Sequence, residues 1–259
     1  MQNFISYKNS KIAYLDVGKG ATIVLLHGFL ENATMWKDVV KELSKTNRVI
    51  CIDLLGHGKS DCIGYVHTMN DMAEAVKEVL NFLHLRKFFI IGHSMGGYVS
   101  LAFAEKYLEN IKGLCLLNSS AQADSNERKE LRTRVSEMAK FNYNNLVKMS
   151  ISNLFATETK AVFSSEIAQI KKEALQTPVQ GYIAATKGMQ LRENKEVVLQ
   201  TVTKRLMIAG ENDPVISFKS IVKEAKRTKT PLVKLVGGHM SLIEDKDGLI
   251  ANLKKFIKG

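Results

Sequence analysis

The sequence is poor in cysteine and proline, with three of each in 259 residues, and it has a single tryptophan. Cys51, Cys62 and Cys115 are odd in number and widely spaced, which argues against a disulfide framework and a cysteine metal site. No apolar run reaches the roughly 18–20 residues that span a bilayer. The first 15 residues lack the charged start and apolar centre of a signal peptide. We therefore expect a cytoplasmic protein.

Acidic residues are also scarce relative to basic ones: 26 Asp and Glu stand against 37 Lys and Arg, which gives a net charge of +11. The basic and acidic counts are 13 and 11 in residues 1–118, 14 and 9 in 119–205, and 10 and 6 in 206–259. Nucleic-acid binding usually requires a clustered basic face, and here the excess is spread out. We expect solvated surface, no nucleic-acid or membrane partner, a small-molecule substrate, and a monomer or homodimer.

Short apolar segments alternate with helical patterns over much of the chain. Apart from an N-terminal hairpin of Phe4–Tyr7 and Ile12–Val17, the predicted strands are Ala21–Leu26, Arg48–Ile52, Phe88–Ile91, Gly113–Leu117, Arg205–Gly210 and Pro231–Val236. Predicted helices are Met35–Leu43, Asp71–Leu83, one from Met95, and Ser241–Ile257. This order predicts an α/β fold with a mostly parallel sheet of about eight strands and helices on both faces.

Residues 119–204 differ from the rest because they contain no clear strand. They show lysine-rich helical patterns over 124–140, 142–155, 160–175 and 178–189. We predict a helical cap inserted over the active edge of the sheet, with residues 1–118 and 205–259 forming the core.

The segment Gly92-His93-Ser94-Met95-Gly96 lies between a buried strand and a helix. This is the context in which a G-x-S-x-G sequence forms a nucleophile elbow. The sharp turn exposes the serine hydroxyl, and glycines on either side relieve crowding against the strand and helix. The helix N-terminus favours negative charge near the serine. The alternative is a glycine-rich turn whose serine only caps the helix.

A serine nucleophile needs a histidine base and a carboxylate that orients the base. Asp213 and His239 follow Ser94 in the chain order that accompanies this elbow, and each comes after a predicted strand. The N–H groups of Phe29 and Met95 are the predicted oxyanion donors.

Other polar residues offer alternatives to these roles. Glu211 is a rival carboxylate, and Asn118 occupies a position where some acids lie but is neutral. His93 is expected to pack, and His27 and His57 to hold loops by hydrogen bonds. No histidine pair has the spacing of metal ligands, so no metal site is expected.

Together, five motifs resemble the α/β-hydrolase superfamily: His27-Gly28-Phe29, Asp53–Ser60, Gly92–Gly97, Gly210–Asp213 and Gly237–Ser241. The pattern is similar to small bacterial carboxylesterases and cofactor-free haloperoxidase-like hydrolases. The resemblance implies the α/β-hydrolase fold, no cofactor, and a cap that shapes the substrate pocket. A serine at position 94 argues against haloalkane dehalogenases and epoxide hydrolases, which use aspartate there.

The resulting hypothesis is a serine hydrolase that cleaves small carboxylic esters through an acyl-enzyme. Candidate pocket walls, which could equally be core packing, are Trp36, Phe141, Phe155 and Tyr182, with Tyr143 and Phe163 beside them. Alternatives on the same fold are a C–C bond hydrolase or lyase, a thioesterase or a lactonase. Cap arginines, notably Arg128 and Arg132 four residues apart, would favour a dianionic substrate. A non-catalytic binding protein is the third possibility.

Overall fold

The fold is that of a computed structural model, which describes residues 2–258 of the chain. Within these residues the strands form one eight-stranded sheet. Its members are β1 (Gln2–Tyr7), β2 (Ser10–Val17), β3 (Ala21–Leu26), β4 (Asn47–Ile52), β5 (Phe88–His93), β6 (Ile111–Leu117), β7 (Arg205–Gly210) and β8 (Leu232–Leu235).

The strand order is β1-β2-β4-β3-β5-β6-β7-β8. The first two strands pair antiparallel, and β2 pairs antiparallel with β4, whereas every pair from β4 to β8 is parallel. At the centre of the sheet, Leu25 of β3 lies between Cys51 of β4 and Ile91 of β5. Because these strands run in the same direction, their carboxyl ends meet at one edge of the sheet, as the sequence predicted. The crossover connections between them place helices on the sheet faces.

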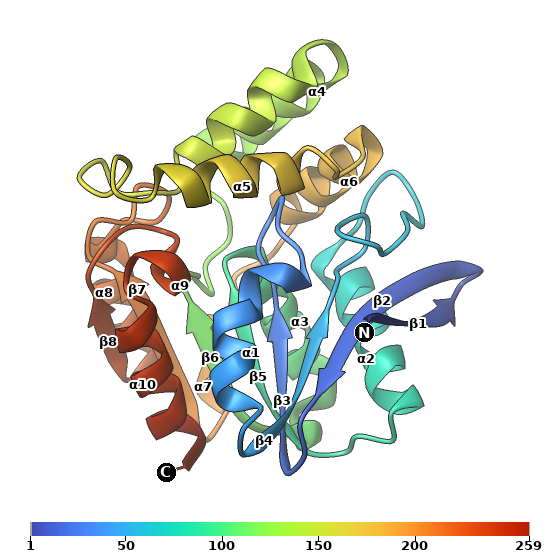
Figure 1. The fold of residues 1–259 in the computed structure, drawn as a ribbon, viewed down its shortest axis with the longest axis vertical. Coiled ribbons are helices and arrows are strands. Elements are labelled where there is room, and N and C mark those ends of the chain that lie inside the picture. Colours follow the sequence, from blue (N-terminus) through green and yellow to red (C-terminus); the bar gives the residue numbers. More distant parts are fainter. Residues whose placement is uncertain (1, 259) are drawn as a thin grey trace.

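Helices cover both faces of the sheet (Figure 1). They are α1 (Lys37–Leu43), α2 (Met69–Phe82), α3 (Met95–Tyr107), α4 (Asn126–Ser152), α5 (Ser164–Ala174), α6 (Val179–Gln190), α7 (Glu196–Thr201), α8 (Phe218–Thr228), α9 (Ser241–Glu244) and α10 (Lys246–Lys258), with short 3-10 turns η1 (Ala33–Trp36) and η2 (Leu108–Asn110). The sequence analysis did not identify α8, although its Ile221 and Ala225 are buried in the core.

Two apolar layers hold the helices to the sheet. On one face, α2 and α3 bury residues such as Val76 and Phe103 against the strands. On the other face, α1 and α10 contribute Val39 and Leu253. The strands are buried on both faces, which explains their continuous apolar sequences. The predicted fold class, an α/β-hydrolase fold with a mostly parallel sheet, is confirmed.

Helices α4, α5 and α6 lie above the carboxyl edge of the sheet (Figure 1). The predicted boundary between helices 124–140 and 142–155 is present within α4, because Asn142 leaves helical geometry (φ −139°, ψ 44°) and a kink there divides α4 into two helices. A third apolar cluster, including Leu30, Val147 and Tyr182, joins these helices to the loop after β3. The last part of the predicted cap range, which contains α7, does not lie over the sheet edge with α4–α6. Instead, α7 packs against α3 and α8 in the core layer.

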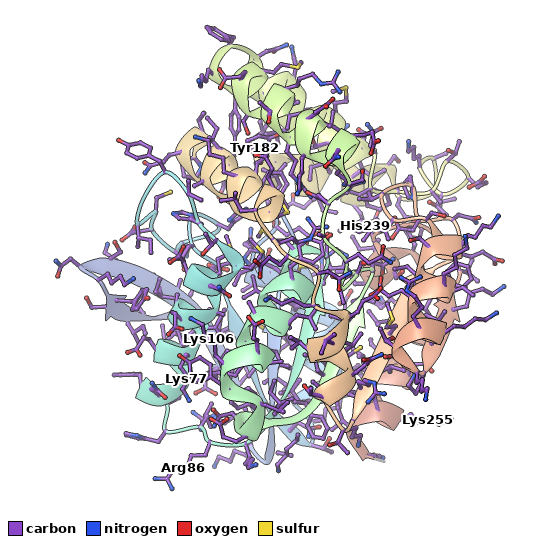
Figure 2. All side chains as sticks on the ribbon, turned by 180° about the vertical axis from the view of Figure 1, so that it is seen from behind. Lys77, Arg86, Lys106, Tyr182, His239 and Lys255 are labelled. Carbon is purple, nitrogen blue, oxygen red and sulfur yellow. The ribbon has the colours of Figure 1, made fainter. Side chains whose placement is uncertain are left out.

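Basic side chains lie on several parts of the core: Lys77 and Lys106 are close together on α2 and α3, whereas Arg86 and Lys255 lie apart from them and from each other (Figure 2). Several basic residues are paired with acidic neighbours, such as Lys106 with Glu74 at 2.7 Å and Lys254 with Glu42 at 2.8 Å. Within residues 2–258, no helix is both long enough and apolar enough to cross a membrane.

Candidate active site

Ser94 occupies the sharp turn between β5 and α3. Its backbone is in the left-handed region, with φ 48° and ψ −115°, which costs energy for a residue with a side chain. Flanking glycines make this turn possible: a Cβ on Gly92 would lie 2.3 Å from the Gly96 carbonyl oxygen, and one on Gly96 would lie 2.3 Å from the Leu26 carbonyl oxygen. The strained serine thus extends beyond the sheet, half-buried, while its neighbours are fully buried.

Ser94, His239 and Asp213 form a hydrogen-bonded chain. His239 Nε2 lies 2.8 Å from Ser94 Oγ, and His239 Nδ1 lies 2.7 Å from Asp213 Oδ2. The side chains of the histidine and the aspartate are 2% and 1% exposed, so bulk water does not compete for this contact. Ser94 and His239 are 145 residues apart in the chain, with Asp213 between them, and the common carboxyl edge of the sheet brings the three together.

Asp213 is held by four hydrogen bonds. Its Oδ2 accepts from Asn118 Nδ2 (3.1 Å) as well as from His239, and its Oδ1 accepts from the N–H groups of Val215 (2.7 Å) and Ile216 (2.9 Å). Burial alone would raise the pKa of this carboxyl, but His239 and the hydrogen bonds outweigh burial and hold the pKa below its usual value. Asp213 therefore remains ionised and can orient the imidazole.

The alternative carboxylate and amide occupy other places. Glu211 is exposed and pairs with Lys234 at 2.9 Å. Asn118 supports Asp213 instead of replacing it, since its amide donates to Asp213 and to the Gly238 carbonyl oxygen at 3.1 Å. These contacts leave Asp213 as the only one of these three side chains that accepts a hydrogen bond from His239.

His27 and His57 hold the neighbouring loops, as predicted. His27 Nε2 accepts a hydrogen bond from the Leu54 N–H at 2.9 Å, and His57 Nδ1 lies 3.1 Å from the Leu55 carbonyl oxygen. Burial lowers the pKa of His57 to about 3, so this ring is neutral at physiological pH.

The predicted oxyanion donors are the N–H groups of Phe29 and Met95, and both residues lie close to Ser94 in the fold. Met95 is the first residue of α3, where the N–H has no acceptor within the helix. Phe29 lines the same cavity as Ser94 and follows β3 at the adjacent strand end. Among residues 2–258, neither N–H donates to a backbone carbonyl. Both groups are therefore free to bind a developing negative charge.

A second histidine–carboxylate pair lies beneath the first. His93 Nδ1 lies 2.9 Å from Glu31 Oε2, and His93 Nε2 lies 2.9 Å from the backbone oxygen of His239. Both ring nitrogens thus face oxygen acceptors, and only the doubly protonated ring can donate to both. Burial would lower the pKa of His93, but Glu31 outweighs burial and raises it. His93 packs, as predicted, and is fully buried, with two acceptors that favour its doubly protonated form.

Glu31 connects this pair to the loop that carries Phe29. Its Oε2 also accepts from the Gly28 N–H at 2.6 Å. Burial would raise the pKa of the Glu31 carboxyl, but His93 outweighs burial and lowers it. Through Glu31 and His93, the loop after β3 (residues 27–31), the turn at Ser94 and the His239 backbone are hydrogen-bonded into one unit.

The His239 loop is also held from the cap side. The His239 N–H donates to the Leu154 carbonyl oxygen at 2.8 Å. Glu244 accepts from the N–H groups of Gly238 (2.9 Å), Met240 (3.1 Å) and, from the segment after α4, Ala156 (3.0 Å). The end of α4 and the histidine loop are thereby fixed to each other.

The sequence analysis missed the roles of Glu31 and Glu244. A signal was available for each. Glu31 follows Gly28 by three residues, a spacing at which a side-chain oxygen reaches back to a backbone N–H. Ser241-Leu242-Ile243-Glu244 matches the S-x-x-E pattern of a helix start. Neither signal predicts which strand ends the carboxylates join, because that depends on the folded sheet.

Ser94 lines a cavity of about 90 Å³ between the sheet edge and the cap. His239 lies just below the cap helices (Figure 2). The cavity's apolar walls come from the β3 loop, α3, the cap and the loop after β7: Phe29, Leu30, Tyr98, Ile151, Leu154, Met189 and Val215. Beside Ser94 and His239, its polar lining residues are Arg128, Arg132, Ser150 and Glu31. Within residues 2–258, no group of three or more His, Cys, Asp and Glu side chains could hold a metal ion.

None of the four aromatic residues predicted as pocket walls lines this cavity, so that prediction was wrong. Phe141 is 89% exposed on α4 and faces solvent, so it cannot contact a substrate held at Ser94. Trp36 and Phe155 are fully buried in the apolar layer beside α1 and α10. Tyr182 is buried in the cap cluster and packs against Phe29, with ring centroids 4.9 Å apart and ring planes tilted by 57°, so it supports the cavity wall without lining it.

Comparison with known proteins gives the chain a family. A sequence model of the alpha/beta hydrolase fold matches residues 21–246. A thermophilic esterase from Thermogutta terrifontis superposes with a TM-score of 0.93 and 30% identity, covering 100% of this chain and 98% of that one. The enol-lactonase from Burkholderia xenovorans gives a TM-score of 0.91 at 21% identity, covering 99% and 100% of the two chains, which shows a shared fold.

Among curated sequences, the 2-hydroxy-6-oxononadienedioate/2-hydroxy-6-oxononatrienedioate hydrolase of Escherichia coli is 35% identical over 116 residues. The match covers 42% of this chain and 40% of that protein. Matches to other curated relatives likewise span only 31–40% of their lengths. The family match extends over most of the chain and confirms the predicted resemblance. The chain therefore belongs to the α/β-hydrolase fold family.

Proposed function

We propose that this chain is a serine hydrolase that cleaves small carboxylic esters, with Ser94 as the nucleophile. The observation that carries the proposal is the unbroken chain from Ser94 Oγ to His239 Nε2 (2.8 Å) and from His239 Nδ1 to Asp213 (2.7 Å), placed at a cavity. The esterase from Thermogutta terrifontis, similar over its whole length, supports the same reaction class.

The reaction would proceed through an acyl-enzyme. His239 takes the Ser94 proton as Oγ attacks the ester carbonyl, and the N–H groups of Phe29 and Met95 bind the oxyanion. His239 then gives the proton to the leaving alcohol. In the second half, His239 activates a water that hydrolyses the acyl-enzyme, and Ser94 is restored. Each oxyanion donor contributes about 3–4 kcal/mol in comparable sites.

The size of the cavity bears on the substrate. Its volume of about 90 Å³ is well below the roughly 300–1,000 Å³ of sites that enclose drug-sized ligands. We therefore propose short acyl groups.

The test is the hydrolysis of p-nitrophenyl esters from acetate to decanoate by the wild type and Ser94→Ala. We expect turnover that is fastest for short chains and that falls by about 10⁴-fold or more in the variant. A serine-directed fluorophosphonate probe should label the wild type and not Ser94→Ala. Absence of both labelling and turnover in the folded protein would instead favour a non-catalytic binding protein.

A second candidate is the hydrolysis of a C–C bond next to a ketone in an acidic substrate. The Escherichia coli relative is named for dioate substrates, and the Thermogutta terrifontis esterase is described with malate bound. The observation in this chain that favours it is the presence of Arg128 and Arg132 in the cavity with Ser94. Faster turnover of a 2-hydroxy-6-oxo dienedioate than of any p-nitrophenyl ester would favour this reaction over ester cleavage.

A further inference from the structure

Two arginines of α4 share the cavity with Ser94 and His239. Arg128 and Arg132 are one helical turn apart, so they lie on the same face of the helix. Both line the cavity. Ser94 and His239 belong to the sheet edge below, and α4 lies above it (Figure 1). A substrate bound between the sheet and the cap would therefore meet positive charge on its cap side.

The arginines are not neutralised by their acidic neighbour. Asp124 has a fully buried side chain, and three guanidinium groups surround it: Arg132 bonds its Oδ2, Arg192 Nη1 lies 2.7 Å from its Oδ1, and Arg128 Nε lies 3.8 Å from Oδ1. One negative charge thus faces three positive charges. This cluster has two positive charges in excess.

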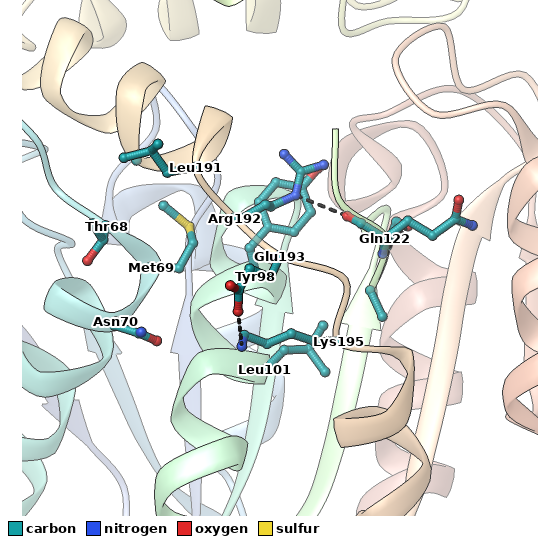
Figure 3. A pocket seen from close by; sticks show the side chains of 13 residues that line it. Thr68, Met69, Asn70, Tyr98, Leu101, Gln122, Leu191, Arg192, Glu193 and Lys195 are labelled. Carbon is teal, nitrogen blue, oxygen red and sulfur yellow. Dashed lines mark hydrogen bonds and ion pairs between the residues drawn. The ribbon is translucent and has the colours of Figure 1, made fainter. Parts of the chain in front are cut away.

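Arg192 reaches Asp124 from outside the catalytic cavity. Its guanidinium lies over the ring of Tyr98, 4.0 Å from the centroid, and its Nε donates to the Gln122 carbonyl oxygen at 3.2 Å (Figure 3). Arg192 lines the pocket drawn in Figure 3, whereas Arg128 and Arg132 line the cavity of Ser94, and Tyr98 borders both. Asp124 therefore also pairs with Arg192, which lies on the other side of Tyr98. Its single negative charge does not neutralise Arg128 and Arg132, and these two residues keep positive charge that a substrate in the cavity can meet.

The donors of Arg132 point to a specific ligand. Within residues 2–258, its Nε is the only nitrogen of its guanidinium that donates to protein, and its side chain is 12% exposed. Its two terminal nitrogens match the two oxygens of a carboxylate. Arg128 donates a hydrogen bond from Nη1 to the Val215 carbonyl oxygen at 3.1 Å, and it lies beside Arg132. Glu31 also lines the cavity, but it is paired with His93.

We propose that Arg132, assisted by Arg128, binds a carboxylate of the substrate, so that the preferred substrates are esters that carry a free carboxylate on the acyl or the alcohol part. This inference rests on the proposed ester hydrolysis. It goes beyond it by naming the substrate class and the residues that select it.

The experiment compares charged and neutral substrates of the same shape. On the acyl side, kcat/KM is measured for p-nitrophenyl hydrogen glutarate and p-nitrophenyl pentanoate. On the alcohol side, it is measured for 4-acetoxybenzoate and 4-acetoxybenzamide. We expect the wild type to prefer the charged member of at least one pair by 10-fold or more. Arg132→Gln should reduce that preference to within 3-fold of unity.

Matched variants separate this site from the general positive charge of the protein. Arg134 is exposed two residues further along α4 and does not line the cavity. Arg134→Gln removes the same charge and should keep the preference of the wild type. Arg132→Lys keeps the charge beside Asp124 but loses the paired nitrogens, and should retain only part of the preference. Arg128→Gln provides an independent variant if Arg132→Gln does not fold.

The outcomes distinguish the two proposals. If hydrolysis depends on Ser94 but the wild type prefers neither charged ester, or if the preference survives in both Arg132→Gln and Arg128→Gln, the carboxylate site is wrong and the ester hydrolase stands. If no ester is hydrolysed, calorimetry on Ser94→Ala decides with glutarate and its monoamide. Tighter glutarate binding that is lost with the added Arg132→Gln supports the site, and equal or absent binding of both compounds overturns it.

Discussion

The molecule contains two buried histidine–carboxylate pairs whose imidazole rings lie 5.1 Å apart. In His239–Asp213, the second ring nitrogen faces the hydroxyl of Ser94. In His93–Glu31, the second ring nitrogen faces a backbone carbonyl oxygen. The residue types and distances are nearly the same, so the difference lies in what the second nitrogen meets.

That difference suits the two histidines to different roles: His239 to the proposed role of a base, and His93 to that of a buried cation that holds the structure. A neutral His239 can accept the proton of Ser94, because the hydroxyl is a donor. His93 faces two acceptors and must carry both protons, so it has no lone pair to offer. His239–Asp213 is suited to proton transfer at the cavity. His93–Glu31 holds the loop after β3 and the His239 backbone in place. Their variants should therefore fail in different ways.

The largest effect on rate is expected from Asp213→Asn. The amide cannot hold the Nδ1 proton of His239 as the carboxylate does, so the ring adopts the wrong tautomer toward Ser94. We expect kcat to fall by about 10⁴-fold, measured with p-nitrophenyl acetate. Circular dichroism and thermal melting control for folding. A loss of less than 10-fold would mean that Asp213 does not orient the base.

The largest effect on stability is expected from Glu31→Gln. The change leaves the His93 cation buried without its partner, which costs about 3–5 kcal/mol of unfolding free energy in comparable pairs. Urea denaturation measures this change. The rate should fall less than in Asp213→Asn, because the catalytic side chains remain. A variant as stable as the wild type would contradict a buried ion pair.

A dependence on pH follows from the same pair. The raised pKa of His93 means that its stabilisation is present below the ordinary pKa and is lost as pH rises through the folded value. The lowered pKa of Glu31 means that its stabilisation is present above the ordinary pKa and is lost as pH falls through the folded value. Each tenfold difference in proton affinity between the folded and unfolded states corresponds to about 1.4 kcal/mol.

The stability difference between wild type and His93→Gln should thus be largest near pH 5–6 and shrink as the pH rises. Urea denaturation of both proteins from pH 5 to 9 measures it, and titratable groups that do not interact with His93 cancel in the difference. A difference that does not change over this range would mean that His93 does not gain a proton on folding.

The smallest effect is expected from Glu211→Gln. This carboxylate is two residues from Asp213 but is exposed and pairs only with Lys234. An exposed ion pair contributes about 0–1 kcal/mol, so kcat and stability should remain close to the wild-type values. The variant serves as the matched control for Glu31→Gln. A large loss of activity would instead assign Glu211 to the site.

Local sequence was sufficient to predict the strands, the nucleophile turn and the order Ser94, Asp213, His239. Strands buried on both faces must be continuously apolar, and the turn requires glycines at fixed positions, so both features are written in short segments. The cap was less predictable. Its helices and the break between two of them at Asn142 were predicted, but Phe141, predicted as a pocket wall, faces solvent.

The sequence by itself thus determined the α/β architecture and the residues able to form a triad, because periodicity and turn chemistry act over a few residues. Only the tertiary structure decided which side chains meet. It paired Glu31 with His93, turned Glu244 toward the His239 loop, and placed Arg128 and Arg132 in the cavity. Glu31 and His93 are 62 residues apart and Glu244 and Ala156 are 88 residues apart, so burial and geometry, rather than local pattern, select these contacts.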